Sequence, residues 1–243
     1  MTPELLILLA AVFVIAALYS SVGHAGASGY IAVMSLMSIS PLIIKPTALS
    51  LNILVASITT WQFYRSGHFS WALFWPFAIL AVPFAFLGGH LALPTHLFKI
   101  LLGLVLIYSA IRLLIKSEQA IDVKEAPRMQ AIAAGGGIGL LSGLTGTGGG
   151  IFLTPLLIFM GCADAKKAAA VSALFVLLNS ISGLAGNIAA TKSLPPYIIS
   201  MLIAVALGGG LGAYVGSRRI QSPAIKKLLA VVLLIAGLKL IFT

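Results

Sequence analysis

A glycine-rich break interrupts a long apolar stretch twice in this chain. The first copy reads Gly23-His-Ala-Gly26-Ala-Ser-Gly29, and the second reads Gly143-Leu-Thr-Gly146-Thr-Gly-Gly149, 120 positions later. Lipid offers no partner to the backbone groups that a broken helix releases, so such breaks occur only where protein or a polar cavity surrounds them. Two breaks at matching places in two halves therefore indicate a ligand site between the halves.

The composition identifies the surroundings of these breaks as a membrane. Of the 243 residues, 60% are apolar and 8% are charged, whereas soluble domains are roughly 45–50% apolar and about 25% charged. The net charge of +10 comes from basic residues in loops between apolar runs, which is a signal of membrane orientation. No nucleic-acid partner is therefore expected. The single Cys162 excludes an intrachain disulfide and a paired-cysteine metal site.

Apolar runs separated by short polar segments predict one all-α membrane transport domain over residues 1–243, built from two repeats. The first repeat covers 1–116, a polar connector covers 117–128, and the second repeat covers 129–243. Helices are expected over 3–21, 28–39, 46–64, 71–92, 96–115, 129–141, 149–160, 166–187, 195–217 and 224–242.

The distribution of Lys and Arg predicts the topology. If the first two helices of each half return to the side they started from, eleven basic residues lie on one face and four on the other. If each pair makes a single broken crossing, the split is eight to seven, so the positive-inside rule favours the first arrangement. It predicts an inverted repeat in a bacterial inner membrane, with a cytoplasmic connector and both termini outside the cytoplasm. A helix over 28–39 would be about 18 Å long, too short to span the bilayer, which predicts about eight transmembrane helices plus two short re-entrant ones.

The two helix starts that follow the breaks suit an anion. A helix start presents free N–H groups and the positive end of the helix dipole, and Ser28, Thr145 and Thr147 add hydroxyl groups. The expected substrate-binding residues are His24, Gly26, Ser28, Gly29, Tyr30, Ser50, Asn52, Thr145, Gly146, Thr147, Gly148, Gly149, Gly150, Ser172 and Asn179. For the glycines at 135–139, 208–212 and 216, close helix packing is the preferred interpretation.

Several of these residues have two open interpretations. His24 either titrates near its reference pKa of about 6.5 or caps a turn through its ring nitrogens. The polar side chains of the third helix of each half, such as Asn52 and Asn179, either hydrogen-bond the broken backbone or line the substrate path. His68, His90 and His96 lie near expected membrane interfaces and are taken as structural.

The chain has no Asp or Glu within an expected span, since Glu4 and Asp164 fall at membrane edges. A cation substrate would therefore lack a counter-charge, whereas an anion would not. No carboxylate pair, metal cluster or nucleophile with a base is found in the spans, so no enzyme activity, metal or cofactor is expected.

The order of these motifs resembles the sulfite exporter TauE/SafE family over essentially the whole chain. The resemblance is carried by Gly23-x-x-Gly-x-x-Gly29, by Gly143-x-x-Gly-x-Gly-Gly-Gly150 with Pro155, and by the Ser172…Asn179…Gly183 pattern. It implies transport of sulfur oxyanions or organosulfonates, such as sulfite, sulfoacetate or taurine-derived products, with neither a cofactor nor a covalent step. His24 stands where the second copy has Leu144, so the two half-sites are not equivalent.

The leading hypothesis is a secondary transporter that holds a small sulfur-containing anion between two opposed helix starts and moves it by alternating access. One alternative is a carrier for another oxyanion or a small carboxylate. Another is a non-transporting membrane subunit that docks a partner through its basic cytoplasmic face. The expected partners are the anion, the lipid bilayer and, in a homo-oligomer, a second copy of the chain.

Overall fold

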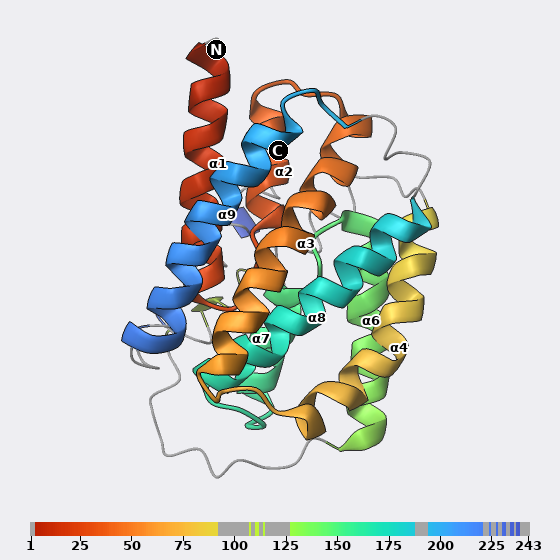
Figure 1. Ribbon diagram of the computed structural model, residues 1–243. Helices are drawn as coiled ribbons and strands as arrows, with labels where there is room; N and C mark the ends of the chain where they lie inside the picture. Colours follow the sequence, from red (N-terminus) through yellow and green to blue (C-terminus); the bar gives the residue numbers. More distant parts are fainter. Residues whose placement is uncertain are drawn as a thin grey trace.

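Every regular element that the structure describes is helical. The computed structural model describes residues 3–91, 127–187 and 194–220, with single positions between 107 and 114 and between 224 and 238. The elements are α1 (Pro3–Ser21), α2 (Ala27–Leu36), α3 (Pro41–Arg65), α4 (Trp71–His90), α6 (Arg128–Thr145), α7 (Gly150–Phe159), α8 (Ala165–Gly186), α9 (Ile198–Tyr214) and the π-helical turn η2 (Val215–Arg219) (Figure 1). The all-α prediction is confirmed for these residues.

Five helices in the described part of the chain are long and apolar enough to cross a membrane. They cover Pro3–Ser21, Ile43–Arg65, Trp71–His90, Ala165–Gly186 and Ile198–Arg219. This number supports a multi-pass membrane protein. The helices expected over 96–115 and 224–242, and the connector over 117–128, lie largely outside the described residues.

The helix bounds differ most from the sequence-based expectations at two places. α3 begins at Pro41 after the N-cap Ser40, ahead of the expected start at residue 46, because a proline in the first helical turn gives up an N–H that has no helical partner there. α6 continues to Thr145, past the expected end at residue 141. α2 and α7 have 10 residues each, about 15 Å at 1.5 Å per residue, so both are as short as predicted.

The long helices pack in pairs that join the first half of the chain to the second. α1 lies along α9, α4 lies along α6, and α3 crosses α8 between these two pairs. The order of elements is also repeated, since a helix, a break, a short helix and two long helices follow one another in each half. The core of the protein is therefore shared by the halves.

Two rows of glycine bring the backbones of paired helices into contact. A Cβ on Gly135, Gly139 or Gly143 of α6 would overlap the backbone carbonyl of Phe77, Ala81 or Ala85 of α4, respectively. On α9 and the following η2, a Cβ on Gly208, Gly212 or Gly216 would overlap the carbonyl of Phe13, Ala17 or Ser21 of α1, respectively. Small residues let membrane helices approach until their backbones touch. The packing role predicted for Gly135, Gly139, Gly208, Gly212 and Gly216 is confirmed, whereas Gly143, which was expected in a break, packs in the same way.

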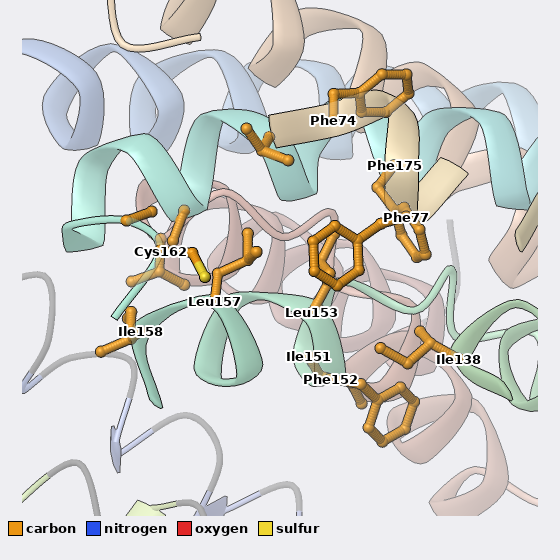
Figure 2. Close-up of a cluster of buried hydrophobic side chains, with 14 of the residues drawn as sticks. Phe74, Phe77, Ile138, Ile151, Phe152, Leu153, Leu157, Ile158, Cys162 and Phe175 are labelled. Carbon is orange, nitrogen blue, oxygen red and sulfur yellow. The ribbon is translucent and has the colours of Figure 1, made fainter. Parts of the chain in front are cut away.

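An apolar cluster fixes the short helix α7 in the second half. Figure 2 shows Ile151, Leu153 and Leu157 of α7 beside Phe77 of α4 and Phe175 of α8. All five side chains are buried. Since α7 alone has too few residues to be stable in isolation, this packing holds its first turn in place.

The glycine row of α6 gives a stability test with a matched control. Replacing Gly139 with alanine should lower the unfolding temperature, because the new methyl group overlaps the Ala81 carbonyl and overpacking costs about 1–3 kcal/mol. Replacing Gly137 should leave that temperature unchanged or raise it, because its Cβ would meet nothing within 4 Å and alanine favours a helix. Thermal unfolding in detergent measures both, and equal unfolding temperatures would contradict the packing analysis.

Candidate functional site

The first break separates α1 from α2 and covers residues 22–26. Gly23 and Gly26 have φ angles of 82° and 102°, a backbone conformation that residues with a Cβ rarely adopt. A Cβ on Gly23 would also overlap the backbone carbonyl of Ala169 on α8. The first break therefore lies directly against a helix of the second half.

The second break separates α6 from α7 and covers residues 146–149. Gly146, Gly148 and Gly149 have φ angles of 73°, 78° and 82°. A Cβ on Gly148 would lie 2.7 Å from Nδ2 of Asn52 on α3 and 2.9 Å from Oγ of Ser180 on α8. This break thus lies between the third helices of the two halves.

The backbone conformations correct the alignment of the two breaks. The left-handed glycines Gly23 and Gly26 match Gly146 and Gly149, which are 123 positions further along the chain, not 120. At the spacing expected from sequence, Gly29 lies inside α2 and Gly143 lies inside α6. Gly143 resembles a break residue in sequence, but it belongs to the glycine row that packs on α4.

The carboxamide of Asn52 joins the two breaks. Its Oδ1 accepts a hydrogen bond from the backbone N–H of Ala27, the first residue of α2, at 3.0 Å. Its Nδ2 donates to Oγ of Ser180 at 3.2 Å and to the carbonyl of Thr147 in the second break at 3.4 Å. Asn52 is fully buried. Asn52 therefore hydrogen-bonds the interrupted backbone, which is one of the two roles open for this residue.

His24 makes a second connection between the halves. Its Nε2 lies 2.9 Å from Oγ1 of Thr154 on α7, and the Thr154 hydroxyl donates to Oγ of Ser172 on α8 at 2.7 Å. Because the Thr154 proton is directed to Ser172, the His24 Nε2 is the donor in the first bond. A Cβ on Gly150 would lie 3.2 Å from the His24 ring, so the ring lies against the start of α7.

Several buried polar atoms around the second break lack a hydrogen-bond partner in the described residues. They are both amide atoms of Asn179, the hydroxyl of Ser142 and Nδ1 of His24. Asn179 lies one turn from Phe175, which contacts Gly149, and one turn from Gly183, which contacts Gly143, so it shares the face of α8 that meets α6 and the break. An unsatisfied buried polar atom costs about 1–3 kcal/mol, and a polar ligand or water can remove that cost.

Four other expected substrate-binding residues contact residues that are nearby in the chain. Ser28 donates to the Tyr19 hydroxyl at 3.2 Å, and Tyr30 donates to the Ala25 carbonyl at 2.6 Å. Ser50 donates to the carbonyl of Pro46 in its own helix at 2.9 Å. Gly29 packs on Ile15.

Thr145 and Thr147 form a pair at the second break. Their hydroxyl oxygens lie 2.9 Å apart, and Thr145 also donates to the Leu141 carbonyl at 2.6 Å. The structure therefore brings together His24, Asn52, Thr147, Gly148, Gly150 and Ser172, while Ser28, Gly29 and Ser50 lie outside this group.

Three further residues belong to the site although they are not in the expected substrate-binding set. Thr154 and Ser180 complete the hydrogen bonds of His24 and Asn52. Lys45 lies with its Cγ 3.0 Å from the Cβ position of Gly146, and its Nζ donates to the Gly89 carbonyl at 3.3 Å. Thr154 was recognisable, since it is the polar residue one turn after the first residue of α7.

The surroundings of the breaks carry no acidic side chain in the described ranges. The acidic residues there are Glu4, which is exposed at the start of α1, and Asp164, which is exposed and accepts from the Lys167 N–H at 2.8 Å as the cap of α8. Within the same ranges no group of His, Cys, Asp and Glu has the arrangement of a metal site. The local field at the breaks comes from helix starts, hydroxyl and amide dipoles and Lys45.

The peripheral histidines bind backbone carbonyls. A ring nitrogen of His68 lies 3.2 Å from the Ser217 carbonyl, and Nδ1 of His90 lies 3.1 Å from the Gly186 carbonyl. Each contact joins one half of the chain to the other. His96 lies outside the described residues.

Removal of the Asn52 carboxamide tests whether it holds the breaks together. Asn52→Ala should destabilise the protein by about 1–3 kcal/mol, because the buried Ala27 N–H loses its acceptor. Ser57→Ala is the control on the same helix, since this exposed hydroxyl only bonds the Ile53 carbonyl of its own turn. A drop in the midpoint of thermal unfolding for Asn52→Ala alone is the expected result, and an unchanged midpoint would show that Asn52 does not hold the breaks.

The comparisons with known proteins give the family of the chain. The sequence model of the family described as "Sulfite exporter TauE/SafE" matches residues 8–240. The chain is 44% identical, over the whole of both chains, to the "Probable membrane transporter protein y4hK" of Sinorhizobium fredii. It is 29% identical to the "Probable membrane transporter protein YunE" of Bacillus subtilis over 43% of this chain and 38% of that protein. No solved structure matches. The family model and these names support a membrane transporter, and the chain belongs to the TauE/SafE sulfite exporter family.

Proposed function

We propose that this protein is a secondary transporter for a small sulfur-containing anion, sulfite or an organosulfonate. The anion would lie between the starts of α2 and α7, next to the second break. The observation that carries this proposal is the group of buried polar atoms without partners at His24, Ser142 and Asn179. A protein interior rarely leaves such atoms unsatisfied, and a ligand that accepts hydrogen bonds would satisfy the donors among them.

The charges around the breaks favour a ligand with negative charge. The starts of α2 and α7 present backbone N–H groups and positive dipole ends. The side chain of Lys45 passes beside Gly146 and places its positive charge on the Gly89 carbonyl, and the acidic side chains of the described residues are exposed at the ends of helices. An anion would be stabilised here, whereas a cation would meet no negative charge among these groups.

The pairing of the helices supports an inverted repeat. By their order in the two halves, α1 corresponds to α6 and α4 corresponds to α9. The pair of α1 with α9 therefore corresponds to the pair of α6 with α4, and both pairs are observed. In Figure 1, α1 descends from the N-terminus at the top while α6 rises from its start at the bottom. Two halves of opposite direction around one site are the architecture of alternating access. A bacterial inner membrane with both termini outside the cytoplasm completes this proposal.

The choice of sulfur rests on the family, since helix starts and amides also bind other oxyanions. Uptake of radiolabelled sulfite and methanesulfonate into proteoliposomes tests transport directly. Competition by phosphate and acetate, each unlabelled, then separates a sulfur-anion carrier from one for another oxyanion or a carboxylate. Absence of movement of either sulfur anion by a folded protein would refute the proposal.

Asn179→Leu tests the site with two opposite readouts. We expect the initial rate of methanesulfonate uptake to fall at least about tenfold, because the carboxamide that faces the break is lost, while the unfolding temperature stays the same or rises, because an unpartnered buried polar group is removed. Ser57→Ala is the control for both measurements. Full transport by a stable Asn179→Leu protein would remove Asn179 from the substrate path.

A further inference from the structure

We propose that Nδ1 of His24 is a proton-binding site, and that the protein carries one proton together with each monovalent anion. This inference rests on the proposed function, because it assigns the co-substrate of the same site. It starts from the hydrogen bonds of His24, which leave one ring nitrogen without a partner.

The chain of hydrogen bonds fixes the state of the ring. Thr154 donates to Ser172, so His24 donates from Nε2 to Thr154. A neutral ring then carries a lone pair on Nδ1, and this atom is buried without a partner in the described residues. His24 as a whole is 1% exposed. The ring therefore has one free position for a proton, while its other nitrogen is held by α7 and α8.

The groups around the ring would not neutralise a histidinium ion. The Tyr19 ring of α1 lies beside the His24 ring, with the two ring centroids 6.4 Å apart. The Tyr30 hydroxyl of α2 donates its hydrogen bond to the Ala25 carbonyl. α7 and α8 present the Thr154 and Ser172 hydroxyls and the Gly150 backbone to this position.

Three basic residues lie on the elements that surround the breaks. Lys45 of α3 lies beside the second break, and Lys166 and Lys167 lie in the first turn of α8, ahead of the Ala169 that contacts Gly23. Both acidic side chains of the described ranges are exposed: Asp164 accepts from the Lys167 N–H as the N-cap of α8, and Glu4 lies in the first turn of α1.

Binding of the proton and binding of the anion therefore depend on each other. A buried charge is costly unless an opposite charge is close, so the proton binds to Nδ1 when an anion occupies the adjacent helix starts, and the anion binds more tightly when Nδ1 holds the proton. This mutual dependence is a coupling free energy, and it is reciprocal. The proton comes from water on the side where the anion enters, occupies the Nδ1 lone pair, and returns to water on the opposite side. The loaded site gains no net charge from a monovalent anion.

Calorimetry of methanesulfonate binding tests this inference in the wild-type protein. Methanesulfonate stays ionised over the working range, so any proton taken up belongs to the protein. Titrations near pH 7 in buffers with different ionisation enthalpies should show uptake of close to one proton per anion. The apparent Kd should rise about tenfold for each pH unit where uptake is complete. Binding without proton uptake would overturn the inference but leave the proposed function intact, whereas failure of both methanesulfonate and sulfite to bind would refute the function itself.

Histidine variants then assign the proton to one residue. His24→Gln keeps an amide donor near Thr154 but has no titratable ring, and any binding that it retains should occur without proton uptake. His68→Gln, His90→Gln and His96→Gln should each retain it. Proton uptake by His24→Gln, or its loss in any of the three others, would overturn the assignment. If His24→Gln does not bind methanesulfonate, the three control variants decide the assignment: proton uptake retained by all three supports His24, and its loss in any of them overturns it.

Transport gives an independent readout of the same coupling. In proteoliposomes, a proton gradient should drive accumulation of methanesulfonate, and a potassium diffusion potential without a proton gradient should not, because the loaded site is electrically neutral. Accumulation driven by the potential alone would contradict cotransport of one proton with one anion.

Discussion

The hydrogen bond between the Asn52 carboxamide and the first N–H of α2 decides whether this chain can interrupt its helices inside a membrane. A released backbone N–H has no partner in lipid, and Asn52 supplies one from a neighbouring helix. Its amide nitrogen reaches the second break and Ser180 at the same time. One side chain on the third helix of the first half thereby stabilises interrupted backbone in both halves.

The same constraint explains the type of chemistry that the site offers. Backbone groups, amides and hydroxyls surround the breaks, and the exposed acids Glu4 and Asp164 lie at helix ends. A charged ligand in such a site has to bind together with a counter-ion, or lie at the positive ends of helices. The proposals for the anion and for the proton at His24 both follow from this scarcity of fixed charge.

Much of the fold was predictable from sequence because lipid imposes simple rules. The apolar runs gave the helix order, and the spacing of glycines predicted both the breaks and the packing role of Gly139 and Gly212. The register of the breaks was not predictable, because Gly143 matches a break residue in sequence and only its contact with Ala85 shows that it lies within α6. Thr154 was missed because its importance comes from a partner, His24, 130 residues away in the chain.

The glycine rows also limit how this protein can change shape. They press α6 onto the backbone of α4 and α9 onto the backbone of α1, and each of these pairs takes one helix from each half. Closely packed surfaces resist sliding because they have no free volume. Any rearrangement that preserves these contacts therefore moves α1 with α9 and α4 with α6. Under the proposed alternating access, the rigid bodies would be two mixed pairs that cut across the sequence repeat, and one pair would turn against the other at the crossing of α3 and α8.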